Sequence, residues 1–288
     1  MKQKFRNGTL IEEKNGQDRF LSLLYGSTFG RILLKPLIRS EISKLAGNFL
    51  STKLSCILIK PFIRNNNIDM TQFENVKYQS YNDFFSRKIR EGARSIDTKA
   101  THFISPCDSK LTVLPITEDT RFTLKHTNYS VASLLKNGEL AREYSGGYAF
   151  IFRLTVDDYH RYCYVDDGIK EGNIRIPGKF HTVNPIANDY FPIYKENTRE
   201  YSILHSKHFG EIIMMEVGAL LVGKIVNHHQ ESKVQRGQEK GFFQFGGSTV
   251  VLLTKADKVK VDKDILENSK DGIETIVKYG EKIGSLAL

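Results

Sequence analysis

The sequence predicts an α+β fold, in which a β-rich, mainly antiparallel core at residues 96–288 follows a helical N-terminal region at residues 1–95. Apolar residues between positions 33 and 58 recur at helical spacing. Beyond about residue 96, short apolar runs rich in β-branched and aromatic residues are separated by turn residues, which is typical of strands. A hydrophobic fraction of 40% is sufficient for a packed core.

The helical region is strongly basic between Arg19 and Arg64, where Glu41 is the only acid. Its basic residues are Arg19, Arg31, Lys35, Arg39, Lys44, Lys53, Lys60 and Arg64. Pro36 and Pro61 interrupt the pattern, so two or three short helices are expected rather than one long helix. Basic amphipathic helices can lie in the interface of an anionic bilayer. The pattern is equally compatible with helices packed on a core that present a solvated basic face.

Further elements follow from local patterns. A short helix is expected over residues 81–90, and another over residues 130–140, capped by Ser130 and with Leu134 and Leu135 directed inward. Strands are expected at residues 103–106, 111–114, 148–152, 212–215 and 250–253.

Composition excludes several classes of protein. The longest stretch without a charged residue, at 241–254, has 14 residues, whereas a membrane-spanning helix needs about 20. The basic start is not followed by an apolar run, so no secretory signal is expected. Cys56, Cys107 and Cys163 have no paired spacing, which argues against disulfides or a zinc site and fits a reducing cytoplasm. The excess of 42 basic over 33 acidic residues, a net charge of +9, favours an anionic partner, either nucleic acid or lipid.

The segment Gly246-Gly247-Ser248-Thr249 lies between two strand-like runs. It fits an ordinary glycine turn. It also fits a self-cleaving bond, in which the Ser248 hydroxyl attacks the unshielded Gly247 carbonyl, the amide becomes an ester, and elimination leaves a group that hydrolyses to pyruvoyl. Glycine–serine turns are common, so this motif alone does not establish cleavage.

Two other segments contain groups suited to acid–base chemistry. His160 follows Asp157 and Asp158 at the end of a predicted strand, where a histidine can act as a general base or can simply lie in a polar surface turn. Asp108 follows Pro106, where an aspartate usually caps a turn but can also orient such a base. His228-His229 and the pair His205 and His208 have no convincing third ligand, so no metal is expected.

Taken in order, eight segments resemble the phosphatidylserine decarboxylase proenzymes, and their order and spacing leave little room for chance. The resemblance covers about residues 81–253 and extends more loosely to both ends. The segments are Tyr81-Asn82-Asp83-Phe84-Phe85-Ser86-Arg87, Ile104-Ser105-Pro106-Cys107-Asp108, Asn128-Tyr129-Ser130, Asp158-Tyr159-His160-Arg161, Thr182-Val183-Asn184, Asn197-Thr198-Arg199-Glu200, Met215-Glu216-Val217-Gly218-Ala219 and Phe245-Gly246-Gly247-Ser248-Thr249-Val250. The last segment is most similar to the bacterial branch found in clostridia and their relatives.

The resemblance implies self-cleavage between Gly247 and Ser248, which gives a β chain of residues 1–247 and an α chain of residues 248–288. Ser248 would become a covalent pyruvoyl group. The family's aspartate falls on Asp108 and its base on His160, with Asp158 as an adjoining acid that helps to tune the histidine. The implied reaction converts phosphatidylserine to phosphatidylethanolamine and CO₂ through a Schiff base with the pyruvoyl group, in phospholipid biosynthesis.

The implied partners are phosphatidylserine and an anionic membrane surface, not nucleic acid. The expected assembly is a β–α heterodimer, itself paired as a homodimer, lying peripherally on the cytoplasmic face of the cell membrane. The sequence departs from the family at Cys163, where a second histidine is usual, and at Cys107, where glycine is usual. Two alternatives therefore stay open: a catalytically impaired lipid-surface binding homologue, and a pyruvoyl-dependent decarboxylase of a soluble amino acid, which the basic helical region disfavours.

Overall fold

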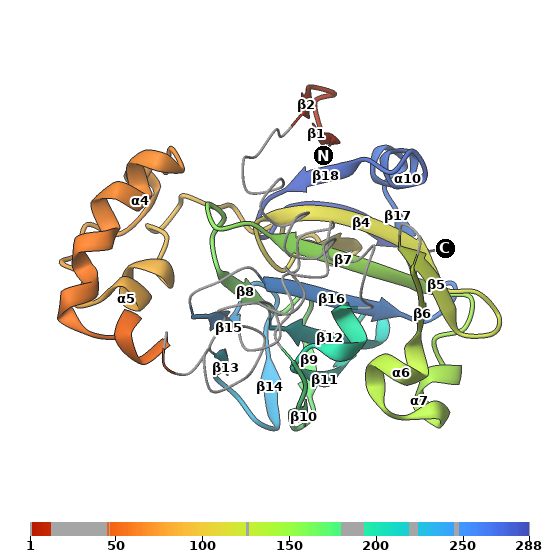
Figure 1. The fold of residues 1–288 in the computed structure, drawn as a ribbon. Helices are drawn as coiled ribbons and strands as arrows, with labels where there is room; N and C mark the ends of the chain where they lie inside the picture. The colour runs from red at the N-terminus through yellow and green to blue at the C-terminus, as the bar shows by residue number, and fades with distance from the viewer. Residues whose placement is uncertain are drawn as a thin grey trace, which may run out of the picture.

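The structure is a computed structural model that describes residues 2–12, 45, 47–124, 127–179, 193–218, 224–244 and 248–287. Its centre is a sheet of 11 strands in the order β14-β9-β11-β12-β16-β7-β4-β18-β1-β2, with β10 paired to β11 (Figure 1). All pairings between these strands are antiparallel except that of β1 with β18. The strands are β1 (Lys2–Phe5), β2 (Leu10–Glu12), β4 (Ser109–Pro115), β7 (Tyr148–Leu154), β9 (Gly168–Lys170), β10 (Ile174–Ile176), β11 (Arg199–Ser206), β12 (Gly210–Val217), β14 (Ser232–Val234), β16 (Ser248–Thr254) and β18 (Glu274–Val277).

Three smaller antiparallel sheets complete the β structure. The first has the order β13 (Ile225–Asn227), β15 (Glu239–Phe243), β8 (Arg161–Cys163). The second has the order β17 (Val259–Val261), β19 (Lys282–Leu286), β3 (His102–Ile104), and the third pairs β5 (Arg121–Leu124) with β6 (Thr127–Ser130). The predicted β-rich, mainly antiparallel core is thus confirmed, and the five predicted strand runs overlap β3, β4, β7, β12 and β16.

Both faces of the central strands β12, β16 and β7 are largely buried, which explains why each contains a continuous run of apolar residues. Along β16, Val250 and Leu252 belong to one core cluster, whereas Val251 and Leu253 belong to the other. Because side chains alternate between the faces of a strand, each neighbouring pair of residues contributes to two cores. β16 lies between β12 and β7, and it is therefore held on both edges as well as on both faces.

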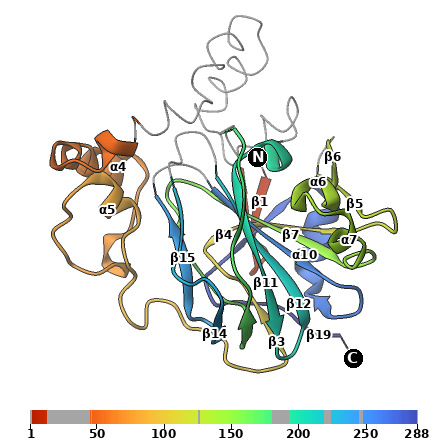
Figure 2. The same cartoon turned by 90° about the horizontal axis from the view of Figure 1, so that it is seen from below.

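A helical layer, residues 47–85, lies to one side of the sheets, as Figures 1 and 2 show for α4 and α5. It contains the 3₁₀ helices η1 (Lys53–Leu58) and η2 (Met70–Gln72) and the helices α4 (Ile59–Asn65) and α5 (Tyr81–Phe85). Its small core is aromatic, with the Phe62 ring edge-on to Tyr81 at 5.3 Å and to Phe84 at 6.0 Å. Residues 47–85 thus contain short helical pieces, whereas the expected helical, membrane-associating region at residues 1–95 as a whole stays a prediction. Residues 13–44 and 46, which include Arg19, Arg31, Lys35, Arg39 and Lys44, lie outside the described residues.

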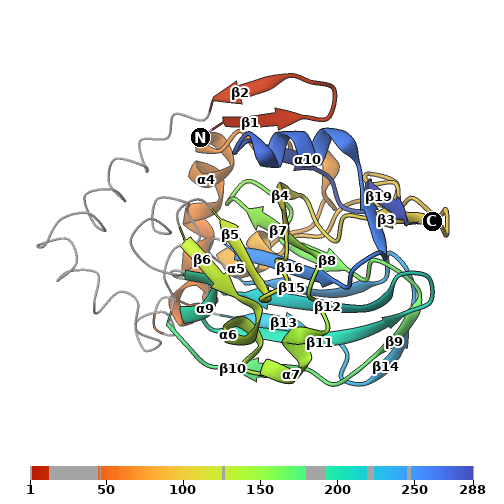
Figure 3. The same cartoon turned by 90° about the vertical axis from the view of Figure 1, so that its right-hand side faces the viewer.

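The N-terminal region differs from the prediction at its start. Residues 2–12 form the β1–β2 hairpin, and β1 extends the central sheet by pairing with β18. The Arg6 guanidinium contacts the Asp262 carboxylate at 2.8 Å and the Asp264 carboxylate at 2.9 Å, which ties the hairpin to the N-terminal end of α10 (Lys263–Lys270) (Figure 3). The first residues of the predicted helical region are therefore part of the β core. The division near residue 95 stays a prediction.

Two helices are shorter than predicted. The helix expected over residues 81–90 ends at Phe85. The one expected over residues 130–140 is split into α6 (Val131–Leu135) and α7 (Gly138–Arg142), because Lys136 adopts a left-handed conformation with φ 53°. Ser130 caps α6 as predicted, and Leu134 and Leu135 are buried. A further short helix, α9, spans Ile193–Glu196. Within the described part of the chain, no helix has the length and apolarity needed to cross a membrane.

Candidate active site

The site is built around a turn, residues 155–160, that connects β7 to β8. Leu154, the last residue of β7, pairs with Ser248, the first residue of β16. At the other end of the turn, the His160 carbonyl accepts a hydrogen bond from the Phe243 backbone N–H at 2.9 Å. Phe243 is the last residue of β15. The turn therefore holds the residues on both sides of the segment 245–247, which itself lies outside the described residues.

His160 is buried, with 1% of its surface exposed. Its Nδ1 lies 2.9 Å from the Asp158 carbonyl oxygen, so Nδ1 carries the proton and donates it to that oxygen. The Nε2 atom is also buried and has no hydrogen-bond partner among the described residues. Burial, and secondarily the positive charge of Arg87, lowers the pKa of His160 to about 3. The ring is therefore neutral at physiological pH, with its free lone pair on Nε2.

Ser248 is fully buried at the start of β16, and its Oγ atom has no hydrogen-bond partner in the described structure. A buried hydroxyl without a partner is unfavourable by about 1–3 kcal/mol. Ser248 shares this state with other buried hydroxyls, among them those of Thr249 and Thr254, so it is the place of Ser248 in the predicted cleavage bond that distinguishes it. Gly247, the other residue of the predicted cleavage bond, lies outside the described residues. The structure brings the strand that carries Ser248 to the turn that carries Asp158 and His160.

Asp158 is connected to the site through two different groups. Its carboxylate accepts hydrogen bonds from the Lys110 ammonium at 2.7 Å and from the Thr155 backbone N–H at 2.7 Å, which fixes the turn. Its backbone carbonyl accepts the proton of His160 Nδ1. Burial raises the pKa of Asp158, an effect that the Lys110 charge opposes. The predicted tuning of His160 by Asp158 thus operates through the peptide carbonyl, and the carboxylate contacts Lys110 instead.

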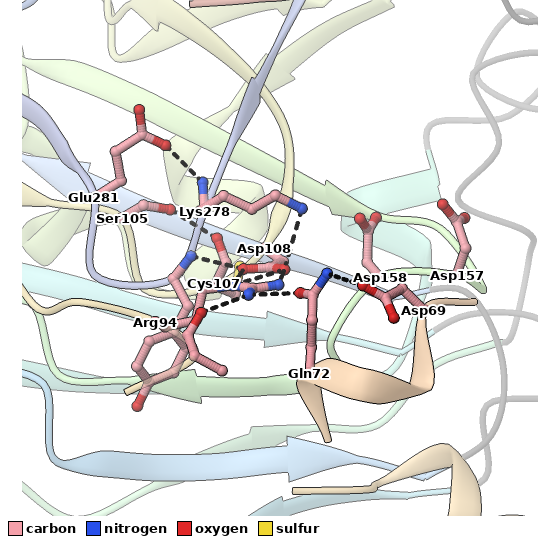
Figure 4. Close-up of polar contacts among 12 residues, drawn as sticks. Asp69, Gln72, Arg94, Ser105, Cys107, Asp108, Asp157, Asp158, Lys278 and Glu281 are labelled. Carbon is pink, nitrogen blue, oxygen red and sulfur yellow. Dashed lines mark hydrogen bonds and ion pairs between the residues drawn. The ribbon is translucent and has the colours of Figure 1, made fainter. Parts of the chain in front are cut away.

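Asp108 has partners other than the histidine it was expected to orient (Figure 4). Its buried carboxylate accepts hydrogen bonds from Arg94 at 2.6 Å and from the Tyr279 backbone N–H at 2.8 Å, and it lies 3.3 Å from the Lys278 ammonium. Burial opposes ionisation, but these partners outweigh it and lower the pKa of Asp108. The expected direct contact between Asp108 and His160 is not formed, because these three groups occupy the carboxylate. A role for Asp108 in processing stays a prediction.

The two cysteines that replace usual family residues are buried thiols. Burial raises the pKa of Cys163 to about 12, and it raises the pKa of Cys107 well above its ordinary value. Both are protonated at neutral pH, so neither supplies a thiolate that could act as a base. Cys163 therefore does not replace the base function of a second histidine.

Sequence patterns did not identify several residues of the site. Lys110 contacts Asp158 from β4, Arg87 contacts the turn from the segment after α5, and Arg94 and Lys278 bind Asp108. Of these four residues, Arg87 alone belongs to a segment of the family resemblance, since it is the last residue of the first segment. Among the described residues, no group of three or more histidine, cysteine or acidic side chains is arranged to hold a metal ion.

Comparisons with known proteins agree with the geometry. A family model for phosphatidylserine decarboxylase matches residues 81–285, which is more than half of the chain. The chain is 51% identical to phosphatidylserine decarboxylase proenzyme 2 of Clostridium acetobutylicum, over 94% of this chain and 92% of that protein. It is 43% identical to the phosphatidylserine decarboxylase proenzyme of Clostridium botulinum and 42% identical to that of Clostridium novyi, in both cases over 95% of each chain.

These matches define the class of protein, a self-processing carboxy-lyase in precursor form. The chain belongs to the phosphatidylserine decarboxylase family, and the predicted resemblance to its clostridial branch is confirmed.

Proposed function

We propose that Ser248 and His160 carry out self-cleavage and contribute to catalysis in this pyruvoyl-dependent phosphatidylserine decarboxylase, which converts phosphatidylserine to phosphatidylethanolamine and CO₂. One observation carries the assignment of residues. The two ends of a single turn hold Ser248 and Phe243, which lie on either side of Gly247, and both His160 Nε2 and Ser248 Oγ are buried without a partner among the described residues.

Cleavage begins with transfer of a proton. His160 Nε2 accepts the proton of the Ser248 hydroxyl, and Oγ attacks the Gly247 carbonyl carbon. The proton then passes from Nε2 to the Ser248 nitrogen as the Gly247–Ser248 amide bond breaks. The product is an ester between Gly247 and the Ser248 side chain, and His160 returns to its neutral form.

Elimination completes the maturation. Loss of the Ser248 α-proton forms a double bond to Cβ and breaks the Cβ–O bond, which releases Gly247 as the carboxylate end of the β chain. Hydrolysis of the dehydroalanine that remains releases ammonia and leaves the pyruvoyl group at the start of the α chain. The β chain has 247 residues and the α chain has 288 − 247 = 41.

The residues present fit a pyruvoyl group at this position, because Ser248 is buried and its Oγ is bound to no other group of the described structure. Once formed from Ser248, the group would supply an electron-accepting carbonyl for decarboxylation of the substrate. In this proposal His160 returns a proton to the substrate α-carbon. The buried surroundings exclude water, which favours loss of a carboxylate charge.

The replacements at Cys107 and Cys163 suggested a catalytically impaired homologue that only binds lipid surfaces. If Ser248 and His160 have the proposed roles, the protein is an active enzyme instead. Neither thiol is ionised, so the activity depends on whether His160 is sufficient as the base. The family membership disfavours the second alternative, a decarboxylase of a soluble amino acid.

Substitution at the two residues tests the assignment. We expect Ser248→Ala to leave the precursor whole, and His160→Ala to slow cleavage by about 10²-fold or more, the usual contribution of a general base. Gel electrophoresis over time measures both. His208→Ala is the matched control, because His208 is paired with Asp166 at 3.1 Å. Unchanged cleavage in His160→Ala would transfer the base function to another residue.

We also propose that the helical layer contacts an anionic membrane surface. Leu54 and Ile57 are each 78% exposed, and Leu45 and Phe49 are exposed as well. The basic side chains of Lys53, Lys60 and Arg64 are exposed in the same stretch. Isolated exposed apolar residues are ordinary, but several beside basic residues are typical of an interfacial segment. The homodimer and the cytoplasmic face of the membrane remain predictions that light scattering and cell fractionation can check.

A further inference from the structure

Two buried side chains donate to the same backbone oxygen. The Asp158 carbonyl lies 2.9 Å from His160 Nδ1 and accepts a second hydrogen bond from Arg87 Nη2 at 3.4 Å. Arg87 Nη2 also donates to the Asp157 carbonyl at 3.3 Å, and Nη1 donates to the Phe85 carbonyl at 3.5 Å. Arg87 is therefore bound to the turn immediately before His160.

The placement of Arg87 is unusual for a guanidinium. The side chain is 2% exposed, and its charged group lies over the Phe73 ring at 4.3 Å and the Phe84 ring at 5.0 Å. None of the described carboxylates forms an ion pair with it, and its Nε has no partner among those residues. A buried cation without a carboxylate is unfavourable, so its retention calls for an explanation.

An aromatic side chain also packs against the His160 ring. The Phe85 ring centroid lies 4.1 Å from that of His160, tilted by 41°. Phe85 is the last residue of α5, and Ser80 caps that helix by accepting a hydrogen bond from the Asp83 N–H. Both Phe85 and Arg87 are consequently positioned by one short helix.

We propose that Arg87 is a positioning residue that holds His160 as a neutral ring with its proton on Nδ1, so that the Nε2 lone pair is available to the Ser248 hydroxyl. The proposal rests on the proposed function of His160. Arg87 supports the acceptor of the Nδ1 proton, and its charge opposes a second proton on the ring.

The charged groups around His160 come from three elements. Arg87 follows α5, Lys110 lies on β4, and Asp157 and Asp158 belong to the turn itself. The Asp158 carboxylate is paired with the Lys110 ammonium. The opposite charges of these two groups therefore have largely cancelling effects on the His160 ring. The Asp157 charge acts in the opposite direction to that of Arg87, but its side chain is 47% exposed and lies 3.9 Å from Lys110, so the buried Arg87 charge has the larger effect on the ring. Because an imidazolium beside Arg87 is unfavourable, His160 releases the serine proton promptly to the leaving nitrogen instead of retaining it.

The test uses the uncleaved Ser248→Ala precursor, labelled with ¹⁵N at histidine, so that it needs no enzyme activity. The ring nitrogen shifts report the tautomer and the pKa, and the loss of a signal in His160→Gln identifies His160 among the eight histidines. We expect His160 to stay neutral with Nδ1 protonated from about pH 8 to about pH 5. In the Arg87→Met variant, we expect the pKa of His160 to rise by about one unit or more. We also expect the Nδ1-protonated and Nε2-protonated forms of the His160 ring to coexist.

Matched variants distinguish a role of Arg87 in positioning His160 from a role in the stability of the fold alone. Arg87→Lys keeps the charge and is expected to keep the low pKa, whereas Arg87→Gln keeps donors without charge and is expected to raise it. Arg199→Met is the control, since Arg199 is equally buried and donates to the Leu134, Ser133, Lys195 and Asn197 carbonyls away from the site. It should leave the His160 signals unchanged.

Either of two results would overturn the proposal. One is an unchanged tautomer and pKa of His160 in Arg87→Met, or in Arg87→Gln should the methionine variant not fold. The other is an equal shift in Arg199→Met. Failure of the proposed function is a separate outcome: if His160→Ala cleaves normally while these shifts appear as expected, Arg87 still positions the ring but His160 is not the processing base.

Discussion

At the scale of single residues, two of the buried polar atoms without a partner belong to the predicted cleavage machinery. His160 Nε2 and Ser248 Oγ are both buried without a partner in the described structure, and each such atom is unfavourable by about 1–3 kcal/mol. The carboxylates of Asp108 and Asp158 are hydrogen-bonded, whereas Thr249 Oγ1 and Arg87 Nε also have no partner in the described structure. What distinguishes His160 Nε2 and Ser248 Oγ is that the proposed cleavage reaction uses both atoms.

The pKa of His160 predicts how stability depends on pH. In the folded chain this pKa is about 3, and in the unfolded chain it is about 6.5. Between these values the unfolded state binds more protons, so the free energy of unfolding decreases as the pH falls from about 6.5 toward about 3. We expect His160→Asn, made in the Ser248→Ala precursor, to flatten that dependence by up to about one proton. Denaturant unfolding at a series of pH values measures it, and an identical slope in both proteins would contradict the value.

Residues of the site could be predicted only where they belong to short contiguous motifs. Ser248, His160 and Asp158 are in this group. The contacts of Lys278 could not be predicted, because it reaches Asp108 across 170 positions of the chain. Asp108 was expected to orient His160, but its carboxylate binds Arg94 and Lys278 instead. The spacing of residues along the chain does not specify which side chains meet in space.

At the scale of elements, strand prediction depended on burial. β16 and β7 were predicted because both of their faces are buried and each contains an uninterrupted apolar run, at residues 250–253 and 148–152. β1 was missed because Lys2–Phe5 is mostly polar and is recruited by pairing with β18. The predicted α chain, residues 248–288, would supply β16 and β18, each of which lies between two strands of residues 1–247. The cleaved chains are therefore expected to stay together through backbone hydrogen bonds and core packing.

One buried ion pair connects the central sheet to the strand that leads into the cleavage segment. Glu216 on β12 and Lys240 on β15 are both fully buried, 2.8 Å apart, and Asn227 hydrogen-bonds to each. We expect Lys240→Met to lower the free energy of unfolding by about 3–5 kcal/mol, because it leaves a buried carboxylate unpaired. Denaturant unfolding of the Ser248→Ala precursor measures the loss.

Two further variants test the cause of that loss. Lys263→Met removes an exposed pair with Glu267 and should change stability by only about 0.3–0.5 kcal/mol. Adding Glu216→Leu to Lys240→Met should recover much of the stability, since no unpaired charge remains. A small loss in Lys240→Met would show that water or rearrangement compensates for the missing ammonium.

At the scale of the whole molecule, the exposed apolar side chains of the helical layer lie in the same stretch as the exposed basic side chains of Lys53, Lys60 and Arg64. The helical layer lies to one side of the sheets in Figures 1 and 2, and its Phe85 ring contacts His160. Its apolar spacing was visible in the sequence, but whether that face packs on the core or contacts a membrane was not. The structure buries Leu50 and Phe84 in the helical layer's own core and leaves Leu54 and Ile57 exposed.

We expect the double variant Leu54→Glu, Ile57→Glu to bind anionic vesicles at least about tenfold more weakly, because it removes apolar contact and adds negative charge. Co-sedimentation with vesicles that contain phosphatidylserine or phosphatidylglycerol measures the binding, which should also weaken with added salt. Ile169→Glu is the control, because Ile169 is 56% exposed on β9, outside the helical layer. Equal loss in both variants would argue against a specific membrane face.

The most direct test of self-processing is the intact mass of the purified chain after incubation. We expect two fragments, of 247 and 288 − 247 = 41 residues, and the smaller one should be lighter by one ammonia than a fragment that begins with free serine. It should also resist N-terminal sequencing and stay bound to the larger fragment until denaturant is added. A chain that remains whole, or a smaller fragment that begins with unmodified serine, would contradict conversion of Ser248 to the pyruvoyl group.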